Sequence, residues 1–233
     1  MAERLPLALL PGLLCDAALW EHQVARLSDM ADCWVADFTT QDSAEAMVES
    51  VLAAMPERFY LAGLSMGGYV ALELMARAPE RVEKLALIDT RAQGDTEEQT
   101  ARRRGLIELA QKGQFKGVTP RLLPLFIHPD RMADEALTAV VMGMAERVGK
   151  DAFLSQQRAI MTRRSHTETL AGITVPTLIL CGRQDALTPL ADHEAMAAAI
   201  AGSELVVVED CGHLATIERP EPVTAAMRRW LQG

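Results

Sequence analysis

Residues 58–82 read RFYLAGLSMGGYVALELMARAPERV and combine three patterns in one order. The apolar run at residues 59–62 is typical of a buried strand. A tight turn of the form Gly-x-Ser-x-Gly follows, with Ser65 at its centre. A second apolar run, residues 69–76, is typical of a buried helix that stops near Pro79. Strand, Gly-x-Ser-x-Gly and helix in this order predict a nucleophile elbow.

The glycines of this turn have a physical reason. A serine on such a tight turn sits in strained backbone geometry, so its neighbours two residues away need very small side chains. The turn lifts the hydroxyl of Ser65 to the N-terminus of the following helix. Free N–H groups and the positive end of the helix dipole stabilise an oxyanion there. A glycine-rich turn that only packs is the alternative, because the motif alone also arises by chance.

The length and composition of the chain limit the class of protein. Of its 233 residues 49% are hydrophobic, enough for one sizeable core, so we expect one domain with an insertion. The formal net charge of -9 argues against nucleic acid or an anionic membrane surface as a partner. Residues 1–11 show no signal-peptide pattern, and no stretch approaches the roughly 20 apolar residues of a membrane span. We therefore expect a cytoplasmic protein.

The cysteines show no CxxC spacing and no histidine-rich metal pattern. They are Cys15, Cys33, Cys181 and Cys211. Without a secretion signal we expect them to be reduced thiols, and we expect no metal and no cofactor. A redox role for Cys15 and Cys211, which lie beside predicted functional loops, is the alternative.

Apolar strand-like runs alternate with helical patterns along most of the chain. The expected strands are residues 5–10, 33–36, 59–62, 84–88, 175–181 and 204–208. The expected helices between and after them include residues 17–27, capped by Asp16, residues 42–55, capped by Asp42, residues 190–201, and a last helix with Pro222 in its first turn. This alternation predicts an α/β fold with a doubly wound, mostly parallel sheet that is covered on both faces.

Residues 94–172 break this alternation. Charged helical stretches replace the strand-like runs there, at residues 95–112, 131–148 and 151–164. The strand pattern then resumes. We therefore expect residues 1–93 and 173–233 to form one core, with residues 94–172 as a helical insertion in it.

Four of the expected strands end in chemically suggestive residues, namely Gly12 and Leu13, Ser65, Asp185 and His213. In a doubly wound sheet, ligands bind at the carboxyl ends of the strands. Serine hydrolysis needs a nucleophile, an imidazole that takes its proton, and a carboxylate that orients the imidazole. The chain order serine, aspartate, histidine is the one expected for this architecture. We predict Ser65 as nucleophile, His213 as base and Asp185 as acid, with activity falling at acid pH.

We expect the backbone N–H groups of Leu13 and Met66 to form the oxyanion hole, because one follows the first strand and the other follows the nucleophile. Two other aspartates compete with Asp185 for the role of acid. Asp89 also ends a strand, and Asp210 is close in sequence to the predicted catalytic histidine.

Three further groups of side chains leave alternatives open. The remaining histidines are His22, His128, His166 and His193. For His128 and His166 we expect a solvated surface, with a pocket wall as the alternative. The arginines near the end of the insertion are Arg158, Arg163 and Arg164. We interpret them as a solvated helix face, with an anion pocket as the alternative. Four methionines of the insertion predict a helical core or an adaptable pocket wall. They are Met132, Met142, Met144 and Met161.

Four stretches resemble the α/β-hydrolase superfamily, in particular its small lidded esterase and 3-oxoadipate enol-lactonase-like members. They are LLPGLLCDAALW at residues 9–20, LAGLSMGGYVALELMARAPERV at residues 61–82, PTLILCGRQDALTP at residues 176–189 and GHLATIERPEPV at residues 212–223. The resemblance implies the same nucleophile, acid, base and oxyanion donors. It also implies that the insertion is a lid over an acyl pocket.

The chain departs from the usual pattern of that superfamily in three places. Pro11 stands where a histidine is common before Gly12, and residues 37–43 replace a common glycine-rich loop. An N-terminal β-hairpin that most members carry has no counterpart before residue 5. We therefore expect about six main strands where the full fold has eight.

These residues predict a serine hydrolase that cleaves a small-molecule acyl substrate, namely a carboxylic ester, lactone or thioester, through an acyl-enzyme on Ser65. The alternatives that keep the same triad are carbon–carbon bond hydrolysis, elimination and perhydrolysis, because a fold does not determine its chemistry. A non-catalytic ligand-binding module is the third alternative.

Overall fold

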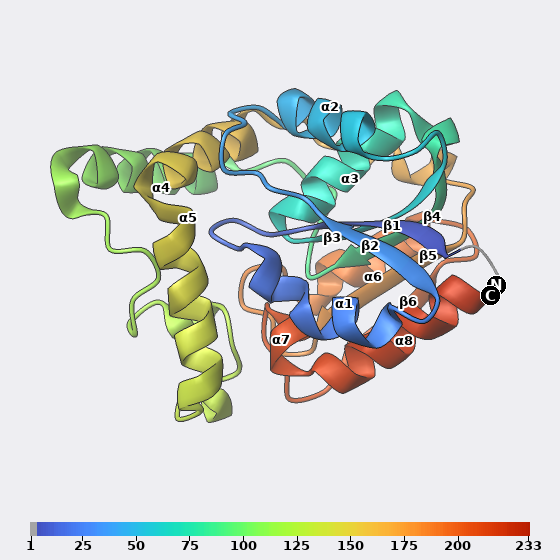
Figure 1. The fold of residues 1–233 in the computed structure, drawn as a ribbon. Coiled ribbons are helices and arrows are strands. Elements are labelled where there is room, and N and C mark those ends of the chain that lie inside the picture. The colour runs from blue at the N-terminus through green and yellow to red at the C-terminus, as the bar shows by residue number, and fades with distance from the viewer. Residues whose placement is uncertain (1–3) are drawn as a thin grey trace.

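The computed structural model describes residues 4–233 and contains one parallel sheet (Figure 1). Its strands follow the order β2-β1-β3-β4-β5-β6. They are β1 (Leu5–Leu10), β2 (Ala31–Val35), β3 (Phe59–Leu64), β4 (Val82–Ile88), β5 (Thr177–Gly182) and β6 (Glu204–Val208). The prediction of six main strands in a parallel sheet is confirmed. Residues 1–3, which belong to the stretch expected to lack a signal peptide, lie outside the described residues.

The middle of the sheet is buried on both faces. All six residues of β5 are buried, whereas the edge strands β2 and β6 are partly exposed. Parallel strands covered by helices on both sides read as continuous apolar runs, which is why periodicity alone located them.

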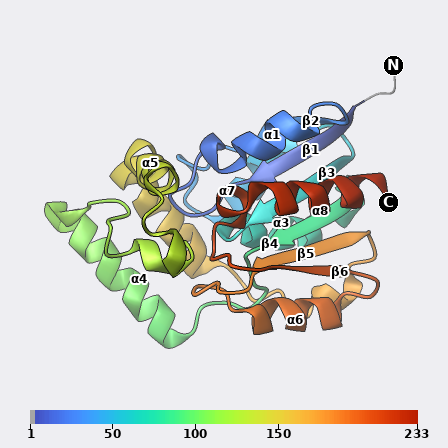
Figure 2. The same ribbon diagram turned by 90° about the horizontal axis from the view of Figure 1, so that it is seen from below.

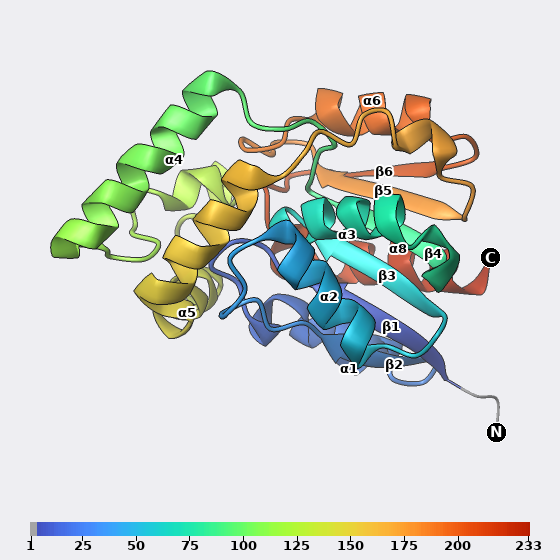
Figure 3. The same ribbon diagram turned by 90° about the horizontal axis from the view of Figure 1, so that it is seen from above.

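Helices cover the two faces as two separate hydrophobic clusters. On one face, α1 (Glu21–Leu27), α7 (Ala215–Glu218) and α8 (Pro220–Gln232) pack against the sheet (Figure 2). On the other face, α2 (Ala44–Ala54), α3 (Met66–Arg77) and α6 (Leu190–Ala199) do so (Figure 3). The doubly wound architecture predicted from the sequence is therefore confirmed.

The segment between β4 and β5 contains two longer helices, α4 (Glu97–Leu109) and α5 (Glu135–Thr162). Both lie beyond the carboxyl ends of the strands (Figures 1 and 3). The sequence predicted separate helices at residues 131–148 and 151–164. The structure joins them into α5, with a kink at Gly149, where the backbone has φ 77° and ψ -179°. Among residues 4–233, no helix has both the length and the apolarity to cross a membrane.

The expected cap of one helix is wrong by one residue, and the expected start of another agrees with the structure. Ser43, not Asp42, caps α2, because it directly precedes the helix and its hydroxyl accepts a hydrogen bond from the Ala46 N–H. The last helix begins at Pro220, so Pro222 lies in its first turn as predicted. The proline at the first position has no N–H group to leave unpaired.

Two histidines, of which one was expected to be solvated, are buried in the structure. The His166 ring lies 3.0 Å from the buried Glu73 carboxylate, so the expectation of a solvated His166 is wrong. The Nε2 atom of His193 accepts a hydrogen bond of 2.9 Å from the Thr90 N–H, and its Nδ1 lies 3.3 Å from the Pro189 carbonyl. His193 is therefore held as a neutral ring.

Two of the arginines differ from the expected solvated helix face, whereas a methionine of the same segment agrees with its expected place in the core. Arg163 is buried, lies 2.9 Å from Asp95 and stacks over the Tyr69 ring at 3.9 Å from its centroid. Arg164 extends from the surface to the buried carboxylate of Glu73 at 2.7 Å. Met144 is part of the core, in agreement with the favoured interpretation of the methionines.

Close packing at Gly67 predicts a large stability loss on substitution. A Cβ atom there would overlap the backbone carbonyl of Leu10, which cannot move without disturbing β1. We expect Gly67→Ala to lower the free energy of unfolding by about 3 kcal/mol. Gly105, inside α4 with no atom within 4 Å of a Cβ, is the matched control. There Gly105→Ala should raise stability by up to about 1 kcal/mol. Urea unfolding measures both, and equal stability of Gly67→Ala and wild type would contradict this packing.

The buried His193 makes stability depend on pH. Burial lowers the pKa of His193 from 6.5 to about 4. Between these values the unfolded chain binds a proton that the folded chain excludes, so stability falls as the pH falls below the unfolded value. From about pH 7 to about pH 5, the wild type should lose about 2 kcal/mol more free energy of unfolding than His193→Gln does. Identical pH dependence of the two proteins in urea unfolding would refute this.

Candidate active site

The turn between β3 and α3 places Ser65 in a strained conformation, with φ 54° and ψ -113°. β4 (Val82–Ile88) and the loop after it hold Ser65 through both its N–H and its carbonyl. The Ser65 N–H donates to the Ile88 carbonyl at 3.0 Å, and the Thr90 hydroxyl donates to the Ser65 carbonyl at 2.8 Å. A Cβ on Gly63 would overlap the backbone of Gly67, so the glycines allow the turn to close. This is the geometry of a nucleophile elbow.

The three residues predicted as a triad lie in hydrogen-bond contact. The Ser65 Oγ atom is 2.8 Å from the Nε2 atom of His213, and the His213 Nδ1 atom is 2.8 Å from the Oδ2 atom of Asp185. They come from the turn after β3 and from the loops after β6 and β5, at one edge of the sheet. His213 and Asp185 are almost completely buried, which strengthens their interaction.

The Asp185 carboxylate is held ionised by its surroundings. Its oxygens accept hydrogen bonds from the Leu187 N–H, the Thr188 N–H and the Thr188 hydroxyl, at 2.8, 3.0 and 2.6 Å. Burial alone would raise the pKa of Asp185, but the neighbouring His213 and the Thr188 hydrogen bonds outweigh it, so that the pKa lies below its ordinary value. A charged carboxylate can therefore orient the imidazole and stabilise its protonated form.

The two rival aspartates have other contacts. Asp89 accepts hydrogen bonds from the Gly182 N–H at 2.9 Å and from the Ala215 N–H at 3.0 Å. Burial, together with the charge of Asp185, raises the pKa of Asp89 well above its ordinary value. Asp210 is exposed and lies 3.9 Å from Arg219. Neither carboxylate contacts the histidine, and Asp89 instead ties β5 to the loop that carries it.

A second buried acid positions the histidine loop, and the sequence reasoning missed it. One oxygen of Glu218 accepts from the Gly212 N–H and the other from the His128 N–H, both at 2.8 Å. The His213 N–H in turn donates to the Phe126 carbonyl at 3.0 Å. The insertion and the histidine loop are thus joined by one carboxylate. The only feature of the local sequence that pointed to this acid is its place five residues after the histidine, at the end of a short helix.

The predicted oxyanion donors lie beside the serine. A Cβ on Gly12 would be 3.4 Å from the Ser65 Cβ, so the Leu13 loop approaches the nucleophile closely. Met66 begins α3, where N–H groups have no acceptor within the helix. In the described part of the chain, neither the Leu13 nor the Met66 N–H donates a hydrogen bond to another residue. Both remain available for an oxyanion.

A glutamine of α5 supports the loop that contains Leu13, and the sequence analysis did not identify it. The Leu14 N–H donates to the Gln156 Oε1 atom at 3.0 Å, while the Gln156 Nε2 atom donates to the Phe38 carbonyl at 3.0 Å. Gln156 is buried, and Leu14 has a positive φ of 59°. One side chain of the insertion therefore supports the strained loop on which Leu13 lies.

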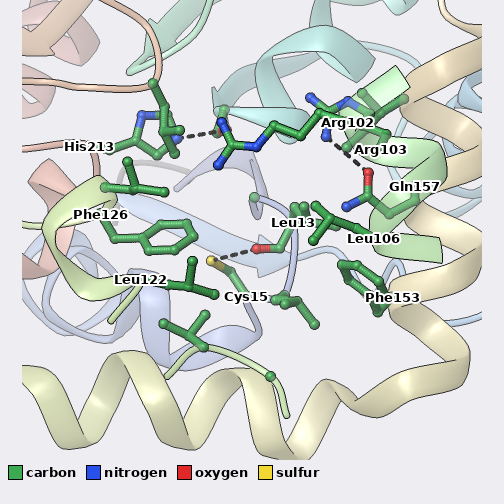
Figure 4. A pocket seen from close by; sticks show the side chains of 18 of the residues that line it. Leu13, Cys15, Arg102, Arg103, Leu106, Leu122, Phe126, Phe153, Gln157 and His213 are labelled. Atoms are coloured by element: carbon green, nitrogen blue, oxygen red, sulfur yellow. Dashed lines mark hydrogen bonds between the residues drawn. The ribbon is translucent and has the colours of Figure 1, made fainter. Parts of the chain in front are cut away.

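A cavity of about 480 Å³ opens above Ser65 and His213. Apolar side chains form much of its wall, among them Phe126 and Phe153 (Figure 4). Residues from α4, α5 and the segment between them line it, so the insertion closes one side of the cavity. The three arginines and four methionines singled out in the sequence are not among the described lining residues.

The four cysteines are free thiols. Cys15 lies in the pocket wall, where burial and then the charge of Asp16 raise the pKa of its thiol to about 12. Such a thiol is protonated at neutral pH and is a poor nucleophile. Within residues 4–233, no group of three or more His, Cys, Asp or Glu side chains is placed to hold a metal ion.

Comparison with known proteins agrees with this geometry. The pimeloyl-[acyl-carrier protein] methyl ester esterase of Neisseria meningitidis serogroup C is 28% identical over 93% of this chain and 85% of its own length. The solved enol-lactonase of Burkholderia xenovorans LB400 has a TM-score of 0.90 at 26% identity, over 100% of this chain and 93% of that one. A thermophilic esterase from Thermogutta terrifontis has a TM-score of 0.88 at 29% identity, over 98% and 89%.

A family model described as the alpha/beta hydrolase fold matches residues 25–220, which is most of the chain. The match includes Ser65, Asp185 and His213. The sequence resemblance to α/β hydrolases is therefore confirmed. The chain belongs to the α/β-hydrolase family and is similar to its esterase and lactonase members.

Proposed function

We propose that this protein cleaves a small carboxylic ester, lactone or thioester through an acyl-enzyme on Ser65. The observation that carries the proposal is the continuous contact from Ser65 Oγ through the His213 ring to Asp185, with 2.8 Å at each step. It lies at the floor of a cavity of about 480 Å³, large enough for a small acyl substrate.

The contact distances support a two-step acyl transfer. Ser65 Oγ attacks the substrate carbonyl carbon while His213 Nε2 takes the hydroxyl proton, and Asp185 stabilises the imidazolium. The carbonyl oxygen becomes an oxyanion that the N–H groups of Leu13 and Met66 stabilise. When the tetrahedral intermediate collapses, His213 gives the proton to the departing alkoxide or thiolate. A water molecule then attacks the acyl-enzyme by the same route and releases the acid.

The names of the relatives support acyl–oxygen cleavage. One is a methyl ester esterase, another an enol-lactonase and a third an esterase. Each acts on an ester bond, either open or in a ring. A thioester presents the same carbonyl to the same nucleophile. Carbon–carbon hydrolysis, elimination, perhydrolysis and simple ligand binding remain the alternatives.

We also infer that residues 94–172 act as a lid on a core made of residues 1–93 and 173–233. The lining of the cavity by α4 and α5 supports this division. The contacts of Glu218 and Gln156 support it further, because they tie the insertion to the catalytic loops from opposite sides.

The test is hydrolysis of p-nitrophenyl esters of increasing acyl length by wild type and Ser65→Ala. We expect the substitution to lower kcat by at least about 10⁴-fold, as removal of a serine nucleophile does elsewhere. Wild type quenched during turnover should carry one acyl group on the peptide that contains Ser65, detected by mass spectrometry. Turnover without that adduct would indicate chemistry without an acyl-enzyme. No turnover by the folded wild type would favour the binding module or a carbon–carbon substrate.

Gln156 gives a separate prediction about the oxyanion loop. The substitution Gln156→Met keeps the length of the side chain but removes the acceptor for the Leu14 N–H. The loop is then held less firmly. We expect kcat to fall about tenfold with KM changed less than about twofold, because oxyanion donors act chiefly in the transition state. Steady-state kinetics with a p-nitrophenyl ester measure the split, and thermal unfolding controls for stability. A rise in KM at unchanged kcat would contradict the positioning role.

A further inference from the structure

We infer that the pocket selects acyl substrates that carry a second, anionic oxygen group, and that Arg102 and Arg91 bind that group. The inference rests on the proposed acyl transfer at Ser65 and specifies its substrate class. The anionic group is a carboxylate or a phosphate, since guanidinium groups recognise both through paired hydrogen bonds.

The charge of the pocket wall is the first observation. Four basic side chains line the cavity. They are Arg91, Arg102, Arg103 and Lys116. None of the described lining residues is Asp or Glu, although the chain as a whole has a formal net charge of -9. A cavity of one sign, with partly apolar walls, concentrates the field and attracts ligands of the opposite charge.

Asp95, behind this wall, does not neutralise it. The buried carboxylate contacts Arg103 at 2.6 Å, Arg163 at 2.9 Å and Arg91 at 3.4 Å. Burial would raise the pKa of Asp95, but the hydrogen bond and charge of Arg103 and the charge of Arg163 outweigh it and lower the pKa. The single carboxylate of Asp95 thus holds three guanidinium groups in place. The cluster has a net positive charge, and its members Arg91 and Arg103 line the pocket.

Arg91 has an unused donor. Its side chain is 12% exposed, and one terminal nitrogen donates to Gln99 at 2.9 Å. Its Nε atom is buried and has no hydrogen-bond partner in the described part of the chain. A buried N–H of a charged group is costly to leave unpaired. Because Arg91 lines the cavity, a shift of its guanidinium toward the cavity on binding would bring this N–H to an anionic ligand.

Arg102, like Lys116, is a cation of this group that forms no ion pair within the described residues. Within residues 4–233, no carboxylate lies within ion-pair distance of its guanidinium. It lies on the face of α4 that also presents Arg103 and Leu106 to the cavity (Figure 4). The labelled side chains of Phe126 and Leu122 form the opposite side of the same cavity. An acyl chain can therefore pack on the apolar side while an anion at its far end meets α4.

The chain supplies a matched control for Arg102. Arg104 is exposed on the same helix, carries the same charge and does not line the cavity. Arg102→Gln and Arg104→Gln therefore change the net charge equally. They differ in whether the lost cation faces the pocket, so any difference between them reports local binding of the anion and not a general field effect.

The experiment compares p-nitrophenyl esters of equal acyl length that end in a methyl, a carboxylate or a phosphate group. We expect wild type to prefer an anionic ester in kcat/KM. Arg102→Gln should reduce the anionic-to-neutral ratio by about ten- to a hundredfold, in line with hydrogen bonds between charged groups. Arg104→Gln should leave the ratio unchanged. The carboxylate and phosphate arms identify which anion is preferred.

A binding measurement keeps this inference separate from acyl transfer. Calorimetric titration of adipate into Ser65→Ala should show binding that is weakened at least tenfold by adding Arg102→Gln, but not by adding Arg104→Gln. Ser65-dependent hydrolysis with no preference for anionic esters would overturn the anion site and leave the proposed function intact. Adipate binding that depends on Arg102 without any ester turnover would overturn the acyl transfer and retain the anion site. Equal effects of the two arginine substitutions would overturn the assignment to Arg102.

Discussion

The strained backbone of Ser65 is the constraint around which the core packs. A residue with φ 54° and ψ -113° persists only when its surroundings hold it. Here β1 and α3 approach so closely that Gly67 meets the Leu10 carbonyl, and the Ile88 and Thr90 contacts hold the Ser65 peptide from β4. The same closeness brings the loop after β1 to the serine. The close packing of β1 against α3 is therefore also what places the oxyanion donors beside Ser65.

Three buried carboxylates hold the histidine and its loop in place. Asp185 contacts the ring, while Asp89 and Glu218 accept only backbone N–H groups around the loop. Asp185 therefore stabilises the charged imidazole, whereas Asp89 and Glu218 position the loop. Burial raises the pKa of Glu218, and burial with the Asp185 charge raises that of Asp89, whereas Asp185 remains ionised.

The sequence predicted those parts of the molecule that depend on local patterns. Buried parallel strands are continuous apolar runs, and Ser65, Asp185 and His213 each follow such a run at a recognisable turn. It did not reveal Gln156 or Glu218, whose partners lie 142 and 90 residues away along the chain. Their roles exist only once the insertion folds back on the core. The burial of His166 beside Glu73 was missed for the same reason.

Helix α4, in the segment between β4 and β5, differs from the helices that cover the sheet in how it is held. No residue of α4 is buried, and Leu106 and Leu109 are exposed where they border the cavity. Polar contacts attach this helix. Arg103 donates hydrogen bonds to the Asp95 carboxylate and to the side-chain amide oxygen of Gln157 in α5. A helix with little apolar burial has low local stability and readily changes position, which suits a wall that must admit a substrate. Arg91 and Arg103, which attach α4, also contribute to the positive charge of the cavity. The charge of the cavity and the position of α4 therefore depend on one cluster of side chains.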